Sequence, residues 1–220
     1  MLTTLFNGNF SLPNFLLQLV VMSIVAFIVF PMRCAAQAFV ADQLGDPTPR
    51  YNGRLTMNPR SHMDIFGTIM VFLFGIGFTK PIPMNPNNFR NRRTGLIMTA
   101  LAGPVVGILV AIASVGAFRV CTLFISDYTL LSILLDALVY VFASVNISLS
   151  VFTMLPIPFL DGYRIVSLFL PYKWVYMIEQ YSQYITLGLM LLIFSGALSG
   201  VLGFLSSAIL NGILFMFRLI

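Results

Sequence analysis

The chain has 220 residues, of which 59% are hydrophobic and 9% charged, and it carries a net charge of +5. Soluble domains contain roughly a quarter charged residues, so this composition excludes a soluble globular protein and predicts a polytopic protein of the lipid bilayer. The surplus of Lys and Arg is typical of loops that face the cytoplasm and anionic lipid, and it therefore does not indicate a nucleic-acid partner.

The first apolar run covers residues 16–32 and is close to the roughly 20 residues that a membrane-spanning helix needs. No Pro or Gly interrupts the chain between Pro31 and Gly45, so we expect the helix to continue to residue 44, with a kink at Pro31. No basic stretch precedes this run. We expect it to stay as a membrane anchor and not to be removed as a signal peptide.

The second apolar run, residues 63–78, is shorter and contains three glycines. Cations flank it on both sides: Arg50, Arg54 and Arg60 before it, and Lys80, Arg90, Arg92 and Arg93 after it. If this segment crossed the membrane, one basic cluster would lie on the side that Lys and Arg avoid. A short span and a re-entrant segment are therefore both open.

Two further runs, residues 95–125 and 130–155, are separated by a polar turn at 126–128 and predict a helical hairpin. Arg119 and Asp136 would lie at similar depth in such a hairpin, where they either form an interhelical ion pair or extend separately toward the interface. Residues 184–220 supply one long or two short closing helices, and small residues at 195–200 mark a break. Gly196 and Gly200 match a small-residue packing motif, which we expect to pack within this chain.

Residues 45–61 are rich in Pro, Gly, Asp and Arg, and they contain the alternating sequence Gly53-Arg54-Leu55-Thr56-Met57. This pattern predicts turns around a short strand at the membrane face. The predicted fold is an all-α integral membrane protein: one domain over residues 1–220, a helical bundle with four to six membrane segments, and a small strand-turn element after the first helix.

Four motifs occur in order along most of the chain: Leu44-Gly45-Asp46-Pro47-Thr48; Gly53-Arg54-Leu55-Thr56-Met57-Asn58-Pro59 followed by His62 and Asp64; Ala100-Leu101-Ala102-Gly103-Pro104; and Leu155-Pro156-Ile157-Pro158-Phe159-Leu160-Asp161-Gly162. Together they resemble the site-2 protease family of intramembrane zinc metalloproteases. The resemblance implies a His-Glu-x-x-His helix about a dozen residues before the Gly-Asp-Pro turn. It also implies a third zinc ligand at Asp161.

This chain does not have the His-Glu-x-x-His motif. Counting back from Gly45 places Arg33 at the first zinc His of the family, Cys34 at the catalytic Glu and Gln37 at the second His. A guanidinium stays charged and opposes a bound dication, a thiol cannot replace the carboxylate base, and an amide oxygen is a weak ligand. Asp161 would be the surviving family ligand, and one carboxylate is too few for zinc. We therefore expect no catalytic residues and no bound metal, although zinc is the cofactor of the family.

The departures extend to the rest of the former active-site region. Gly107 and Thr153 stand where the family commonly has Asn, which weakens any claim to substrate binding or oxyanion stabilisation. Asn58, His62 and Asp64 match a family segment. The latter two either lie near the old active site or hydrogen-bond the turn that re-enters the membrane, and we favour the second interpretation.

Asp161 suggests a specific replacement for the metal. An ionised carboxylate at bilayer depth is costly unless it is paired, so we hypothesise an ion pair between Arg33 and Asp161 in place of the zinc cross-link. Two alternatives remain: Asp161 pairs with Arg164, or it caps the helix that starts near Gly162.

The resemblance and its gaps predict a pseudoenzyme, a site-2-protease-like protein that binds or sequesters a transmembrane helix of another protein without cutting it. The first alternative is an active zinc-dependent intramembrane metalloprotease that hydrolyses peptide bonds. The second is a small channel or carrier that uses Arg33, Arg119, Asp136 and Asp161 as a polar path. From the compact size and the family form, we expect the inner membrane of a bacterium.

Overall fold

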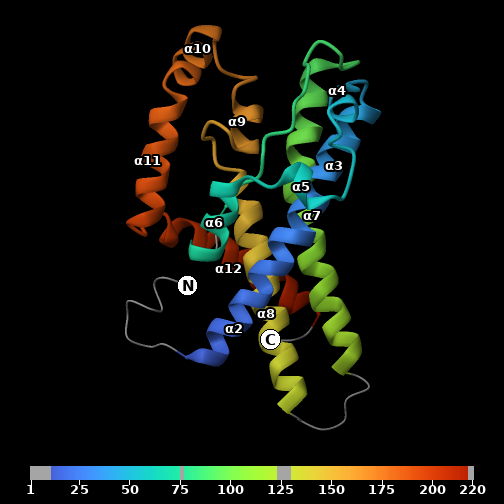
Figure 1. Ribbon diagram of the computed structural model, residues 1–220, viewed down its shortest axis with the longest axis vertical. Helices are drawn as coiled ribbons and strands as arrows, with labels where there is room; N and C mark the ends of the chain where they lie inside the picture. Colours follow the sequence, from blue (N-terminus) through green and yellow to red (C-terminus); the bar gives the residue numbers. More distant parts are fainter. Residues whose placement is uncertain (1–10, 75–76, 123–129, 218–220) are drawn as a thin grey trace.

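A computed structural model describes residues 11–74, 77–122 and 130–217. Figure 1 shows a bundle of long helices with a layer of short helices and loops at one end. In the described residues the only β-pairing is one antiparallel bridge, between Met63 and Thr79. Three helices are long and apolar enough to cross a membrane. The all-α membrane class predicted from composition is confirmed.

The first of these helices is continuous over 32 residues, and it consists of α2 (Leu12–Ile24), η1 (Val25–Val29) and α3 (Phe30–Gln43). Pro31 has no N–H, and its ring would clash with the carbonyl one turn earlier in a regular α-helix. The helix widens into a π-turn directly before it, in which the N–H of Phe30 donates to the carbonyl of Val25. The distortion expected at Pro31 is therefore located in the preceding turn.

The other two long helices are α7 (Arg92–Thr122) and α8 (Leu130–Thr153), which pack against each other, while α7 also packs against α3. They form the predicted hairpin, although the turn expected at residues 126–128 lies outside the described residues. Arg119 is half-buried in the last turn of α7, and Asp136 is exposed on α8. These two residues form no ion pair in the described structure, because Asp136 faces outward from the bundle.

Helix α6 (Ile65–Phe74) has ten residues, so its length is about 15 Å, half the thickness of a bilayer core. The chain then returns beside it: Met63 pairs with Thr79, and the N–H of Lys80 donates to the carbonyl of His62 at 2.9 Å. The segment thus enters and leaves at the same end of the bundle. The described parts of residues 63–78 begin and end beside each other, with both flanking basic clusters at that end, and we call them the re-entrant segment.

The layer at that end is built from α4 (Thr48–Tyr51), α5 (Pro59–His62) and the loop at 80–91. The strand expected at residues 53–57 does not form. The chain turns at Gly53, whose φ is +64°, and the N–H of Arg54 donates back to the carbonyl of Pro49. In the described residues the alternating sequence has no neighbouring strand with which to pair, and the N–H groups of Gly53 and Arg54 bond carbonyls of α4 instead.

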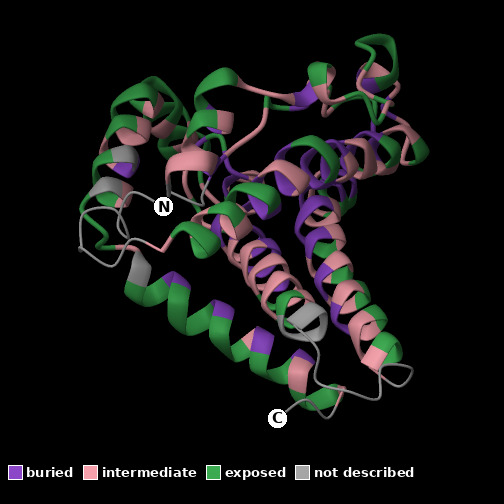
Figure 2. Ribbon diagram, turned by 60° about the horizontal axis from the view of Figure 1, so that its bottom comes forward, coloured by how far each residue is buried: buried purple, intermediate pink, exposed green. Residues whose placement is uncertain are grey.

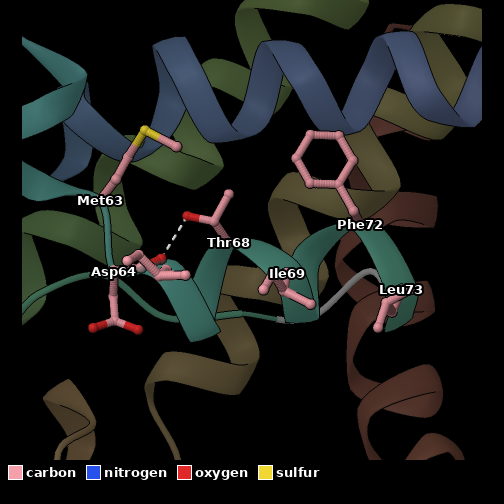
Figure 3. A pocket seen from close by; sticks show the side chains of 7 residues that line it. Met63, Asp64, Thr68, Ile69, Phe72 and Leu73 are labelled. Atoms are coloured by element: carbon pink, nitrogen blue, oxygen red, sulfur yellow. Dashed lines mark hydrogen bonds between the residues drawn. The ribbon is translucent and has the colours of Figure 1, made fainter.

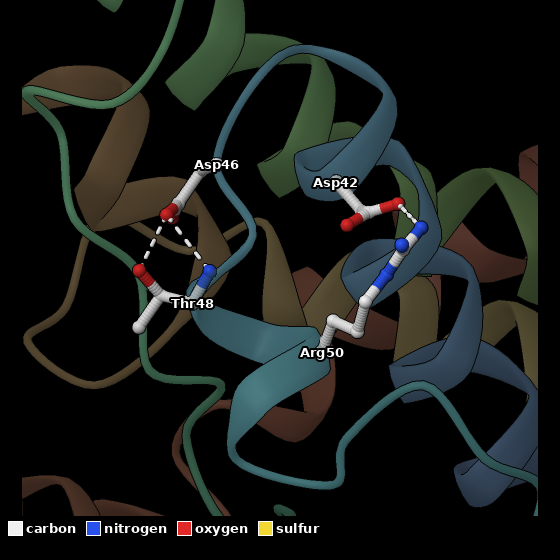
Figure 4. A network of polar contacts seen from close by, with 4 residues as sticks. All are labelled: Asp42, Asp46, Thr48 and Arg50. Carbon is white, nitrogen blue, oxygen red and sulfur yellow. Dashed lines mark hydrogen bonds and ion pairs between the residues drawn. The ribbon is translucent and has the colours of Figure 1, made fainter.

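Asp46 links the start of α4 to the loop at 80–91 within this layer, and it is fully buried. Its carboxylate accepts hydrogen bonds from the N–H and hydroxyl of Thr48, the N–H of Asn85 and the side-chain amide of Asn88. Beside it, Asp42 at the end of α3 forms an ion pair with Arg50 of α4 (Figure 4). Burial acts to raise the pKa of Asp46, but these hydrogen bonds together hold it below its ordinary value.

The C-terminal part consists of four helices: α9 (Asp161–Val166), α10 (Tyr172–Gln180), α11 (Ser182–Phe194) and α12 (Ser199–Met216). The break predicted near residues 195–200 is present, with Gly196 at a φ of +72°. Gly196 and Gly200 therefore do not share one helix. A Cβ on Gly200 would meet nothing within 4 Å, so the packing expected of it within this chain is wrong.

Helix α12 packs against α8 with a single row of buried side chains, visible along its inner side in Figure 2 and formed by Leu202, Ser206, Leu210 and Ile213. Its other faces are exposed and apolar. Helix α10 buries no residue and exposes Tyr172, Trp174 and Tyr176. Aromatic side chains with polar tips favour the boundary between lipid and water, so α10 has the composition of an interfacial helix.

Candidate functional site

Arg33 lies on the buried face of α3, with only 6% of its surface exposed. It precedes the end of α3 at Gln43 by ten residues, which is about 15 Å along the helix axis. If the end of α3 marks the surface of a bilayer core of about 30 Å, Arg33 is close to the mid-plane. A charge at that depth is costly unless other groups hydrogen-bond it.

The Arg33 guanidinium contacts both of the neighbouring long helices. Its Nη2 donates to the hydroxyl of Thr153 at 3.0 Å, while its Nη1 is buried and has no hydrogen-bond partner. On α7, a Cβ at Gly107 would lie 3.4 Å from Nη1 and 2.2 Å from the hydroxyl of Ser150. Gly107 and Thr153, the two positions where the family commonly has Asn, thus both lie against Arg33. Gly107 leaves space for the guanidinium, and Thr153 accepts a hydrogen bond from it.

The next two replaced positions also have neighbours that fit them. The thiol of Cys34 is buried and donates to the hydroxyl of Thr79 at 3.2 Å, on the return arm of the re-entrant segment. Gln37 is buried against Gly103, where a Cβ would come within 2.6 Å of its Nε2. The small residues of α7 therefore admit the side chains of α3, which lets the two helices pack closely.

Asp161 is the first residue of α9 and is half-buried. Burial raises the pKa of its carboxyl group, against the opposing influence of the Arg164 guanidinium, a hydrogen bond from Gln37 and the Arg33 guanidinium. No Arg33–Asp161 ion pair within 4.0 Å is present, since the single ion pair in the described part of the chain joins Asp42 to Arg50. Gln37 makes the direct link instead, and Leu160, not Asp161, is the N-cap of α9.

These side chains surround a cavity of about 40 Å³, which we call the central cavity. It brings together residues from the first helix, the re-entrant segment, α7, α8 and α9. Its lining includes five positions singled out from the sequence, one of them Thr153 of α8. The lining residues are Phe30, Arg33, Cys34, Gln37, Gly77, Phe78, Thr79, Gly103, Thr153 and Asp161.

The other three predicted residues form the turn that leads into α6. Asn58 caps α5 by accepting from the N–H of Arg60, and Asp64 accepts from the N–H of Gly67. His62 is fully buried; its Nε2 donates to the carbonyl of Thr56 at 2.7 Å, and burial lowers its pKa. None of the three lines the central cavity. In this structure they hold the turn, as the favoured interpretation expects.

Figure 3 shows this turn and the face of α6 that follows it. The hydroxyl of Thr68 donates to the main-chain carbonyl of Asp64 at 2.6 Å, and the Phe72 ring points toward the first helix. A shallow pocket of about 350 Å³ lies over this face. It shares no residue with the central cavity, so its size alone does not connect it to the site.

A second hollow does adjoin the central cavity, and we call it the apolar groove. It has a volume of about 210 Å³, and Gly77, Phe78 and Thr79 line both spaces. The remaining walls come from Asp64 and α6, the end of α8, the loop that follows α8, and α11. They are mostly apolar and include Phe152, Phe159, Leu160, Leu189 and Ile193. Phe159 has a φ of +73°, which is strained for a residue with a side chain, and it is 61% exposed.

The side chains around the central cavity do not fit the zinc of the family. Zinc in proteases takes three protein ligands from His, Cys, Asp or Glu. Within the described ranges, no three such residues lie close together. The cavity offers one carboxyl group, a thiol engaged by Thr79, an amide and the guanidinium of Arg33, the residue that the motif spacing aligns with the first zinc ligand of the family. No catalytic step through a metal follows from this donor set.

Two residues of the site could not be singled out from the sequence. Thr79 follows the re-entrant apolar run, and Ser150 lies one turn before Thr153. Both are small hydroxyl residues whose role depends on which helices become neighbours. Arg164, named from its spacing of three residues from Asp161, carries a buried Nη1 with no hydrogen-bond partner.

Comparison with known proteins supports the motif evidence. No family model and no solved structure gives a significant match to the chain. A curated protein of Bacillus subtilis (strain 168), named "Putative zinc metalloprotease YwhC", is 35% identical over 151 residues, which cover 67% of this chain and 68% of that protein. The long apolar helices, the ordered motifs and this relative agree. The chain belongs to the site-2 protease family of intramembrane zinc metalloproteases.

Proposed function

We propose that this protein is an inactive member of its family that holds a transmembrane helix of another membrane protein without cutting it. One observation carries the proposal: the guanidinium of Arg33, which the motif spacing aligns with a zinc ligand of the family, is accommodated by Gly107 and Thr153. A site that had merely lost its ligands would need no such fit. The groove beside it still offers an apolar surface on which a helix could rest.

The active-protease alternative comes from the name of the relative. Cleavage by this chain would need metal-activated water and a carboxylate base, and the central cavity presents a cation, a thiol and an amide at the three motif positions. We therefore rank this alternative second. No contact in the described residues favours a channel or carrier over either.

The membrane arrangement belongs to the same proposal. The three long helices cross the bilayer, α6 enters halfway, and the shorter apolar helices α11 and α12 complete a bundle of four to six segments. We place this bundle, as one domain, in the inner membrane of a bacterium.

The experiment reconstitutes the purified chain in vesicles with a synthetic transmembrane helix and measures bound zinc, helix association and helix integrity by mass spectrometry. The expected result is association with an intact helix and no stoichiometric zinc. Zinc-dependent cleavage would establish the protease instead. The matched variant carries Arg33→His, Cys34→Glu and Gln37→His together, and it should gain zinc if the motif positions are correctly assigned.

A further inference from the structure

We propose that the central cavity receives the carboxylate of an Asp or Glu side chain, carried within the membrane by a partner helix that lies in the apolar groove. This inference rests on the proposed function, because it specifies which helices the protein holds. It assigns to Arg33 the role of recognising that acidic side chain.

The first argument is the balance of charge. Two guanidinium groups, Arg33 and Arg164, act on one carboxyl group, Asp161. When all three are ionised, the cluster has an excess of one positive charge. Charged side chains inside a membrane are stabilised by partners of opposite sign, and within the described part of the chain this cluster has no second carboxylate. A partner that brings a negative charge would neutralise it.

The second argument is an unused donor. Arg33 uses Nη2 to bind Thr153, but its Nη1 has no hydrogen-bond partner, even though it is buried and the residue is only 6% exposed. A buried guanidinium N–H without an acceptor costs free energy, and a carboxylate oxygen is the acceptor that binds it most strongly. Gly107 lies beside Nη1, where a Cβ would stand 3.4 Å away, and it has no side chain that could accept this hydrogen bond.

The third argument is space and access. The central cavity, at about 40 Å³, is slightly larger than the roughly 30 Å³ share of one water molecule, so it admits a carboxylate but not a second helix. The apolar groove, at about 210 Å³, reaches it through the shared wall of Gly77, Phe78 and Thr79. An apolar helix in the groove could therefore direct one short acidic side chain toward Arg33.

The test uses full-length protein in phosphatidylcholine vesicles with a fluorophore on the exposed Cys121. Leucine-rich transmembrane peptides carry a quencher and one central residue, which is Asp, Asn, Leu or Lys. We expect the Asp peptide to bind at least tenfold more tightly than the Asn and Leu peptides, and the Lys peptide to bind least. Moving Asp to either end of the peptide should abolish the preference, because Arg33 is far from both membrane surfaces.

Equal binding of all four peptides would overturn this inference and leave the proposed function intact, since a solvated cavity would then satisfy Arg33. Absence of binding by every peptide would overturn both. In the protein, Arg33→Gln should remove the preference for Asp and retain the binding of the Leu peptide. Arg119→Gln, remote from the cavity, is the matched control and should keep the preference. A preference for Asp that survives Arg33→Gln would also refute the role assigned to Arg33. If the Arg33→Gln variant does not fold, the peptide series on the unaltered protein still decides the question.

Discussion

The main-chain oxygen of Phe78 lies 1.8 Å from the point at which a Cβ on Gly67 would stand. The two arms of the re-entrant segment therefore touch backbone to backbone, and only a residue without a side chain permits this approach. The contact brings Thr79 beside Cys34, so the hairpin supplies one wall of the central cavity.

Replacing Gly67 with Ala should open this hairpin. Backbone atoms cannot rotate away from the added methyl group, so we expect a loss of stability of about 1–3 kcal/mol or more. Thermal unfolding in detergent measures it. Gly188→Ala on α11 is the control, because a Cβ there meets nothing within 4 Å, and its stability should be unchanged or slightly raised. Equal stability of both variants would contradict the close contact.

A second substitution tests the space around Arg33. Gly107→Ala should destabilise the fold by about 1–3 kcal/mol, because the new Cβ would overlap the hydroxyl of Ser150 at 2.2 Å. Ser150→Ala in the same chain should recover much of that loss, giving a favourable coupling energy of at least about 0.5 kcal/mol in a double-mutant cycle. Additive effects would show that the two helices do not approach here as described. Gly212→Ala, which faces open space, is the control.

The buried carboxylate of Asp46 should make the free energy of unfolding depend on pH. Asp46→Ala would leave the N–H groups of Thr48 and Asn85 without their acceptor, at a cost of about 1–3 kcal/mol. Since the pKa of Asp46 is lower in the folded chain, its contribution is complete above the unfolded pKa of about 3.9 and is lost as the pH falls through the lower folded value.

Unfolding in urea between pH 7 and pH 3 checks this expectation. The difference between the original chain and Asp46→Ala should stay constant down to about pH 5 and then shrink. A difference that grows in acid would have the wrong sign. Asp42→Ala is the comparison, because its partner Arg50 is 57% exposed, and such pairs contribute about 0–1 kcal/mol.

The distribution of cations predicts the orientation. Seven Lys and Arg residues surround the layer that contains α4 and the loop at 80–91, while Cys121 stands at the other end of α7, about 45 Å away along the helix. The basic layer should face the cytoplasm. The seven are Arg50, Arg54, Arg60, Lys80, Arg90, Arg92 and Arg93.

Labelling of intact cells with a membrane-impermeant maleimide measures this orientation. Cys121 is exposed and should react from outside, whereas the buried Cys34 should not. In a Cys121→Ser background, Asn87→Cys in the basic layer should react only after permeabilisation. Reaction of Asn87→Cys in intact cells would reverse the orientation.

The long helices could be predicted because they depend on local hydropathy alone, and the runs that begin at residues 16, 95 and 130 lie in the three long helices of the described structure. The re-entrant path could not be decided, since it depends on the contact of Gly67 with Phe78, eleven residues apart in the sequence. The prediction of a strand at residues 53–57 was wrong for a related reason. Alternation favours a strand only where another strand is available, and here a turn at Gly53 satisfies the backbone.

Five residues that the motif spacing singled out, Arg33, Cys34, Gln37, Thr153 and Asp161, all line one cavity. The spacing could not show which of these side chains contact one another. The expected direct contact of Arg33 with Asp161 is replaced by Gln37 and by the nearby Arg164. Which of several neighbouring polar groups reaches a carboxylate depends on side-chain rotamers, and sequence spacing does not encode these.

The continuous first helix has a mechanical consequence. Arg33 and Gln37 lie on the same unbroken α3 as Asp42, which is attached by its ion pair to Arg50 of the outer layer. No loop intervenes that could absorb a movement. A change in the tilt of α3 at the outer layer would therefore also displace the buried guanidinium of Arg33.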